Sequence, residues 1–151
     1  AELAAETRRV RLALEKQRSR ARRGKEIDIK YGEGGMLDVY FAMRFLQLLH
    51  NIPDDTGDRS TTAMLDRLSA LTPLKNVKDE ITALRDGYRF LSALDHNLRL
   101  TVGRTTRVPL GKQAVLERIA ARMKHDAAAE LLQKLTLRRI TIREAFLVLT
   151  A

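Results

Sequence analysis

The longest regular pattern in this sequence runs from residue 76 to residue 101. Its side chains recur at alternating steps of three and four residues, the spacing that puts them on one face of an α-helix. The pattern therefore predicts one long amphipathic helix, and we place this helix at the centre of the fold. The residues on its repeating face are Val77, Ile81, Leu84, Tyr88, Leu91, Asp95 and Leu98.

Composition favours covering that helix with other helices. The chain has 151 residues and is 44% hydrophobic, which is enough apolar material for one domain with a real core. Aromatic residues make up only 5%, Trp is absent, and Ala and Leu fill most apolar positions, a bias typical of helices rather than sheets. We therefore predict an all-α fold, a helical bundle of five or six helices.

Gly, Pro and polar loops separate the other expected elements. Residues 36–50 are apolar on almost every face, which is typical of a helix at the centre of a bundle. Residues 27–30 should form a short extended segment, and residues 103–109 should end the long helix. Further helices are expected over residues 60–70, capped by Ser60 or a neighbouring Thr, over residues 112–124, and over residues 126–149, capped by Asp126.

A basic helix is expected at the N-terminus. Residues 2–23 contain no Gly or Pro, and their apolar stripe is so narrow that the helix should dock weakly or extend outward. We therefore divide the chain into a linking helix, residues 1–23, and a bundle domain, residues 24–151. The stripe consists of Leu3, Thr7, Val10 and Leu14.

The net charge of +9 comes mostly from this first helix. A solvated helix face is the simplest interpretation, and a nucleic-acid-binding module is the alternative. Aromatic residues are not interleaved with the bases, and no zinc-finger, KH or RRM signature is present, so we do not expect nucleic acid as a partner. Against one acid, Glu15, the run has nine bases: Arg8, Arg9, Arg11, Lys16, Arg18, Arg20, Arg22, Arg23 and Lys25.

The absence of cysteine excludes disulfides and thiolate metal sites and fits a cytoplasmic location. No apolar stretch reaches the length of a membrane span, so no membrane partner is expected. The chain begins with Ala1 rather than Met, and we expect it to be part of a longer protein.

A glycine-rich turn precedes the apolar helix. Gly32, Gly34 and Gly35 lead directly into it, so free amides and the helix dipole there have the geometry to receive a phosphate, with Lys30 adding charge. The alternative is a tight turn that needs positive φ and close packing. Asp38, early in the helix, can accept from free backbone amides.

The segment from Lys30 to Phe41 resembles a motif of the glutamine synthetase (glutamate-ammonia ligase) adenylyltransferase family. Tyr88 to Leu91, Asp95 to Arg99, and Val108-Pro109 resemble later segments of the same family, in the expected order. The similarity spans roughly residues 24–125. Residues that match the first motif are Lys30, Gly34, Gly35, Asp38, Val39 and Phe41.

Two residues depart from that motif. Tyr40 stands where the family has Glu, and Arg44 where it usually has Gln. One alternative suggested by these changes is that the protein is a degenerate relative of the family that is kept as a scaffold. We also expect Arg44 to pair with an acidic residue such as Asp95, because both lie in otherwise apolar helical settings.

The resemblance implies a bacterial enzyme with two nucleotidyltransferase units, each a catalytic α/β domain followed by a helical bundle. One unit attaches AMP from ATP to a tyrosine of glutamine synthetase, and the other removes it with phosphate. Mg and ATP are implied for that parent protein, and glutamine synthetase and the PII signalling protein as its partners. This chain looks like one bundle, which positions the neighbouring nucleotidyltransferase domain and contacts it or its nucleotide through Lys30, Gly32, Gly34, Gly35 and Asp38.

No catalytic residue is predicted in this chain. Nucleotidyl transfer needs metal-binding carboxylates on a strand beside a Gly-Ser turn. Glu26-x-Asp28 and Asp54-Asp55-x-x-Asp58 lack that turn, and no strands are expected to support them. His50, His96 and His125 lie too far apart in sequence to suggest a metal site, and His96 should pack between helices. Neither cofactor nor metal is therefore expected in this fragment.

Overall fold

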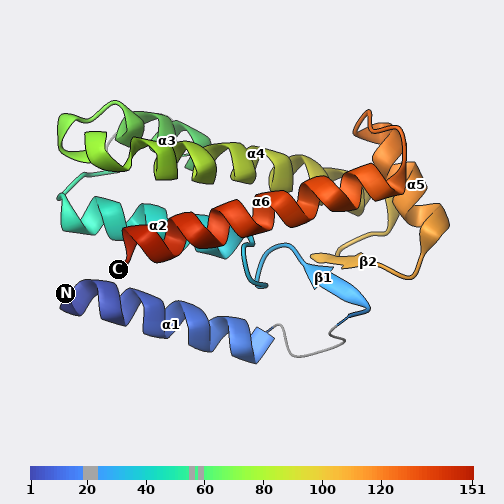
Figure 1. Ribbon diagram of the computed structural model, residues 1–151, viewed down its shortest axis with the longest axis horizontal. Coiled ribbons are helices and arrows are strands. Elements are labelled where there is room, and N and C mark those ends of the chain that lie inside the picture. The colour runs from blue at the N-terminus through green and yellow to red at the C-terminus, as the bar shows by residue number, and fades with distance from the viewer. Residues whose placement is uncertain (19–23, 55–56, 58–59) are drawn as a thin grey trace.

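The computed structural model describes residues 1–18, 24–54, 57 and 60–151. These residues form an all-α bundle of six α-helices, as predicted, with one 3₁₀ helix and two short strands (Figure 1). In chain order the elements are α1 (Glu2–Arg18), β1 (Glu26–Asp28), α2 (Met36–Leu49), α3 (Thr61–Ser69), η1 (Thr72–Val77), α4 (Lys78–Thr101), β2 (Arg107–Pro109), α5 (Gln113–Arg122) and α6 (Ala128–Leu149).

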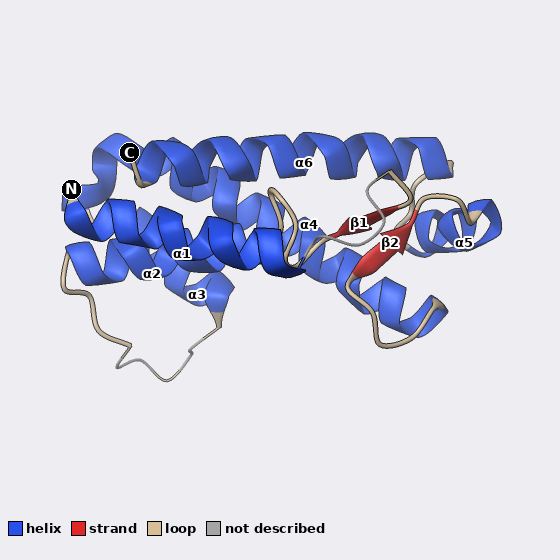
Figure 2. Ribbon diagram, turned by 90° about the horizontal axis from the view of Figure 1, so that it is seen from below, coloured by secondary structure: helices blue, strands red, loops and turns tan. Residues whose placement is uncertain are grey.

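The long helices α4 and α6 lie side by side along the length of the molecule (Figures 1 and 2). The predicted face of α4 is confirmed, since Ile81, Leu84, Leu91 and Leu98 are all fully buried. At the crossing with α6, a Cβ on Gly87 would lie 2.5 Å from Ile142 Cδ1. The bare Gly87 backbone thus sets how closely the two helices approach.

Helix α2 packs between α1, α4 and α6, in agreement with its apolar composition. Val39, Ala42 and Leu46 are buried, whereas Leu48 and Leu49 at its end are 67% and 54% exposed. The central position predicted for this helix is thus confirmed for its first three turns.

A two-stranded antiparallel sheet closes one end of the bundle, where Ile27 of β1 pairs with Val108 of β2. The predicted extended segment is confirmed at β1. Its partner β2 lies within residues 103–109, which were expected only to end the long helix. This strand was not predicted, because pairing between segments so distant in sequence leaves no local pattern. Each strand has only three residues, so this small sheet is far from the sheet of an α/β domain.

Two predicted helix caps had different outcomes. Ser60 Oγ accepts from the Ala63 amide at 3.2 Å and caps α3 as expected. Asp126 does not cap α6, whose N-cap is Ala127. Instead the Asp126 amide donates to Glu130 Oε2 at 2.9 Å. The Glu130 side chain, from the first turn of α6, therefore stabilises the N-terminus of that helix.

Helix α1 lies along α2 and α6 rather than pointing outward (Figure 2). The predicted stripe was wrong at Val10, which is 38% exposed, whereas the adjacent Arg11 is fully buried. A hydrophobic pattern cannot identify the buried face of a helix whose central contact is an arginine. No helix in the described part of the chain has the length and apolar character to cross a membrane.

Candidate functional site

The glycine-rich turn connects β1 to α2, and Asp28 holds its start. Asp28 Oδ1 accepts from the amides of Lys30 and Tyr31 at 3.0 and 2.9 Å. Gly34 has φ +69°, and a Cβ there would lie 2.1 Å from the Arg139 carbonyl oxygen. Positive φ and the passage of α6 directly over the turn both require glycine at this position.

The amides of the turn and of the first turn of α2 already donate within the protein. The Gly34 amide donates to Asp38 Oδ2 at 2.8 Å. A phosphate would therefore have to displace internal hydrogen bonds, and the proposed mechanism of anion binding by free amides does not fit these groups. The other pairs are Gly32 to the Asp28 carbonyl, Gly35 to Gly32, Met36 to Ile29, Leu37 to Lys30, and Asp38 to Gly35.

Asp38 is the centre of a buried ion cluster below the turn. Its side chain is fully buried, and its two carboxylate oxygens lie 2.8 Å from Arg11 Nε and Arg143 Nε respectively. Glu15 adds a second carboxylate, which pairs with Arg143 and lies 3.9 Å from Arg11 Nη1. We call these four residues, from α1, α2 and α6, the buried ion cluster.

Arg11 also connects the cluster to the turn. Its Nη2 donates to the carbonyl oxygens of Tyr31 and Gly32, both at 3.0 Å. A second base, Arg139, donates from Nε to the Glu33 carbonyl at 3.1 Å. The turn is thus held by arginines from both chain ends.

Burial raises the pKa of Asp38, and Arg11, Arg143 and the Gly34 amide oppose that rise. A carboxylate with two guanidinium partners and a backbone donor has its hydrogen-bonding capacity used inside the protein. Asp38 is therefore placed to stabilise the fold, in keeping with the structural alternative for this residue. Contact of Lys30, Gly32, Gly34, Gly35 and Asp38 with a nucleotide or another domain stays a prediction.

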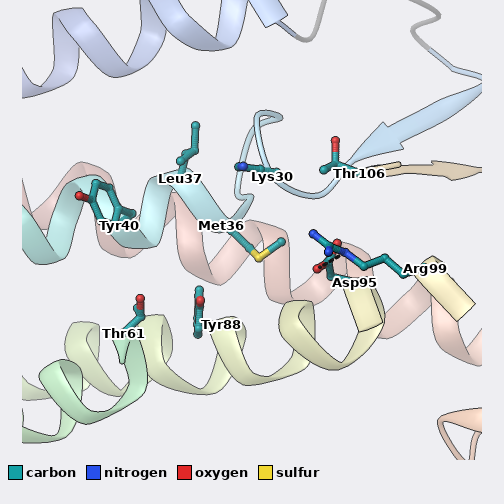
Figure 3. A pocket seen from close by; sticks show the side chains of 9 residues that line it. All are labelled: Lys30, Met36, Leu37, Tyr40, Thr61, Tyr88, Asp95, Arg99 and Thr106. Atoms are coloured by element: carbon teal, nitrogen blue, oxygen red, sulfur yellow. Dashed lines mark ion pairs between the residues drawn. The ribbon is translucent and has the colours of Figure 1, made fainter. Parts of the chain in front are cut away.

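A groove of about 260 Å³ lies beside the turn, between α2, α3 and α4 (Figure 3). It brings together the two segments that carry the strongest family resemblance, which are distant in the sequence. Of the predicted contact residues, Lys30 lines it, with its Nζ 5.3 Å from the centre of the Tyr31 ring. The remaining lining residues are Met36, Leu37, Tyr40, Thr61, Tyr88, Asp95, Arg99 and Thr106.

Asp95 lies beside Arg99 at one end of this groove (Figure 3). Its Oδ2 is 3.3 Å from Arg99 Nε, one helical turn later on α4. Its Oδ1 is buried and has no hydrogen-bond partner among the described residues. The lining of the groove therefore includes two cations and one carboxylate, and one oxygen of that carboxylate has no donor among the described residues.

The two departures from the family motif contact each other. Arg44 Nε donates to the Tyr40 hydroxyl at 3.3 Å, and the guanidinium lies 5.5 Å from the centre of the Tyr40 ring. Arg44 also pairs with Asp54 and donates to Gln47 Oε1 at 3.2 Å. The predicted pairing of Arg44 with an acidic residue is confirmed, but the partner is Asp54 and not Asp95, which pairs with Arg99.

The acidic residues considered for catalysis have structural contacts. Asp28 organises the turn, and Asp54 accepts from Gln47 Nε2 at 2.7 Å as well as from Arg44. Asp55 and Asp58 lie outside the described residues. Across the described ranges, no group of three or more His, Asp or Glu side chains is arranged to hold a metal ion. His96 is exposed, so its predicted packing between helices was wrong.

The basic run on α1 is partly used by the fold. Arg8 donates from Nε to Thr150 Oγ1 at 2.9 Å and also pairs with the Leu147 carbonyl, while Arg11 is buried. Arg9 pairs with Glu6 on the surface at 2.6 Å. Arg20, Arg22 and Arg23 of the same run lie outside the described residues.

Sequence reasoning missed Arg11 and Arg143. Arg143 lies among buried residues of α6, beside Ile142, Ala145 and Phe146. A charged residue in an apolar helical stretch is the signal that identifies such a buried base, since an unpaired one there would be costly.

Comparison with known proteins gives matches over nearly the whole chain. A family described as GlnD PII-uridylyltransferase matches residues 8–150. A curated relative from Mycobacterium avium is 34% identical over 122 residues, which is 75% of this chain and 12% of the relative. Another, from Streptomyces coelicolor, is 36% identical over 97 residues, covering 62% of this chain and 10% of the relative.

Both relatives are named bifunctional glutamine synthetase adenylyltransferase/adenylyl-removing enzyme. A third, from Corynebacterium diphtheriae, has the same name and is 38% identical over 87 residues, 56% of this chain and 8% of the relative. The chain spans about a tenth of the length of these relatives. The resemblance inferred from Lys30 to Phe41 is confirmed.

Proposed function

Because the chain belongs to the family described as GlnD PII-uridylyltransferase, we propose that it is a non-catalytic helical domain of a bifunctional glutamine synthetase adenylyltransferase. Its role is to position a neighbouring nucleotidyltransferase domain and the substrate protein. The whole protein would transfer AMP from Mg-ATP to a tyrosine of glutamine synthetase and remove it again, under control by glutamine and PII.

The position of Asp38 is the observation that carries this proposal. It is the carboxylate within the matching motif, and it is fully buried between two arginines. A metal-binding carboxylate needs an accessible oxygen, whereas both oxygens of Asp38 have cationic partners. The motif of this chain therefore supports a structural role, and the chemistry is assigned to a neighbouring domain.

The curated relatives favour AMP over UMP as the transferred group. Each is named an adenylyltransferase, although the matching family is described by PII uridylylation. Adenylyl transfer to glutamine synthetase is therefore the activity we propose for the parent.

Radiolabelled ATP and UTP, supplied with Mg²⁺, test the proposal with glutamine synthetase and PII as acceptors. We expect the full-length protein to label glutamine synthetase from ATP and the 151-residue chain alone to label neither acceptor. Transfer by the chain alone would contradict the non-catalytic role. Labelling of PII from UTP would contradict the choice of adenylyl transfer, and a full-length protein inactive with both would indicate a scaffold.

The candidate contact residues are tested in the full-length protein. Lys30 is the charged side chain among them that lines the groove, so Lys30→Gln should slow AMP transfer. Lys112→Gln is the matched control, because Lys112 is exposed before α5 and does not line the groove. Equal rates for both variants would remove Lys30 from the proposed contact.

A further inference from the structure

The groove beside the turn has a specific chemical character. Lys30 approaches from the loop after β1, whereas Asp95 and Arg99 come from α4 (Figure 3). Two cations and one carboxylate give the lining of the groove a net positive charge. Such an arrangement attracts an anion, and a guanidinium is well suited to phosphate oxygens.

Asp95 favours a ligand that also has a hydrogen-bond donor, which an anion such as phosphate alone does not supply. Its side chain is only 19% exposed, and its buried Oδ1 lacks a hydrogen-bond donor in the described part of the chain. A buried acceptor without a partner is unfavourable, so a ligand hydroxyl that donates to Oδ1, once the Asp95 side chain turns it toward the groove, gains free energy. Because a carboxylate repels a phosphate, the hydroxyl must lie on a different part of the ligand from the anionic group.

The other end of the groove is formed by aromatic and hydroxyl side chains. Tyr40 and Tyr88 line it together with Thr61, and Met36 lies between the two ends (Figure 3). The volume, about 260 Å³, is below the roughly 300–1,000 Å³ typical of pockets for drug-sized ligands. The groove thus suits a compact ligand.

We propose that this groove binds a small hydroxylated phosphate monoester, of the size of a pentose phosphate. Lys30 and Arg99 bind the phosphate, and Asp95 Oδ1 accepts from a sugar hydroxyl. The ligand is either a free sugar phosphate or the ribose phosphate part of a nucleotide. For a nucleotide ligand this inference rests on the proposed function and deepens it, because Lys30 lines the same groove.

Titrations of the 151-residue chain with ribose 5-phosphate, AMP, ribose and inorganic phosphate test the proposal by calorimetry and NMR. We expect saturable binding of ribose 5-phosphate, with shifts at groove residues and weaker binding of both ribose and phosphate. Tighter binding of AMP would assign the site to nucleotides, and tighter binding of ribose 5-phosphate to free sugar phosphates. Failure of both to bind, or equal binding of inorganic phosphate, would overturn the proposal.

Variants separate the two parts of the site. Arg99→Gln should weaken ribose 5-phosphate binding about tenfold, the effect of losing one hydrogen bond to a charged group. Arg104→Gln removes an exposed arginine just beyond α4 that does not line the groove, and it should leave binding unchanged. Arg99 is 63% exposed, so its replacement should not disturb folding.

Asp95→Asn should weaken ribose 5-phosphate binding but leave phosphate binding unchanged or stronger, because the variant also loses a negative charge. Circular dichroism checks that this variant is folded. If Asp95→Asn and Arg99→Gln both bind ribose 5-phosphate as the wild type does, the assignment is wrong. Because these experiments measure binding by the chain alone, their failure is distinguishable from failure of AMP transfer by the parent.

Discussion

Arg143 and Asp38 are 105 residues apart in the sequence, yet their side chains meet inside the protein with Nε 2.8 Å from Oδ2. This contact joins α6 to the start of α2. Arg11 approaches the other oxygen of the same carboxylate from α1. Three helices from different parts of the chain are thus fixed by one acid.

Removal of Arg143 should destabilise the chain strongly. Arg143→Met leaves Asp38 with one guanidinium partner, and it leaves Glu15 with only Arg11, whose Nη1 is 3.9 Å away. Breaking a buried ion pair typically costs about 3–5 kcal/mol. Urea denaturation followed by circular dichroism measures the loss. Lys134→Met, an exposed position on the same helix, is the control and should change stability by about 1 kcal/mol or less. Similar effects of the two variants would contradict the importance of the cluster.

Gly34→Ala should be more harmful than Gly24→Ala. Both glycines have positive φ, but a Cβ at Gly34 would lie 2.1 Å from the Arg139 carbonyl oxygen, whereas nothing lies within 4 Å of one at Gly24. We expect Gly24→Ala to cost about 1 kcal/mol from backbone strain, and Gly34→Ala about 1–3 kcal/mol more from the clash. Thermal and chemical unfolding of both variants provide the comparison. Equal losses would mean that α6 does not pack on the turn as described.

Gly87→Ala should destabilise the crossing of α4 and α6 despite the better helix propensity of alanine. Its Cβ would lie 2.5 Å from Ile142 Cδ1 and Cγ1, and overpacking of this kind costs about 1–3 kcal/mol. Ile142→Ala removes both atoms and creates a cavity. A double-mutant cycle should show that the two changes together cost less than the sum of their separate losses. Additive losses would contradict direct contact.

The contribution of Asp38 to the free energy of unfolding should decrease as pH rises, which is opposite to the usual effect of a carboxylate. Burial raises its pKa above the ordinary value of 3.8, so the folded state binds the proton more tightly than the unfolded state. The contribution is fully present below the unfolded pKa and is lost as pH rises through the folded pKa. The stability of wild type relative to Asp38→Asn should therefore fall over this interval. Carbon NMR of the carboxyl group measures the pKa directly, and a midpoint below 3.8 would contradict the prediction.

The sequence was sufficient for elements whose signal is local. The period of three and four predicted α4, and continuous apolar residues predicted the central position of α2. Strand β2 gave no such signal, because its three residues are defined by pairing with β1 across most of the chain. The fold class was thus readable from patterns, whereas the sheet depended on tertiary contacts.

The candidate site was less predictable because its residues act across helices. Hydrophobic periodicity treats Arg11 as a polar surface residue, and only its acidic partner on α2 explains its burial. Lys30 was named from its motif, but that it lines one groove with Asp95 and Arg99 follows from the packing of α2 against α4. The Arg44–Asp95 pairing failed for the same reason, since both residues had nearer partners in the chain.

The fit of Gly34 beneath the Arg139 carbonyl has a consequence for how this motif is used to classify proteins. Selection for stability alone would keep the glycines and the buried aspartate, whether or not the protein that carries them still transfers a nucleotide. A relative that had lost its chemistry would still retain the signature. Presence of the motif therefore diagnoses ancestry and fold, and activity must be judged from other residues.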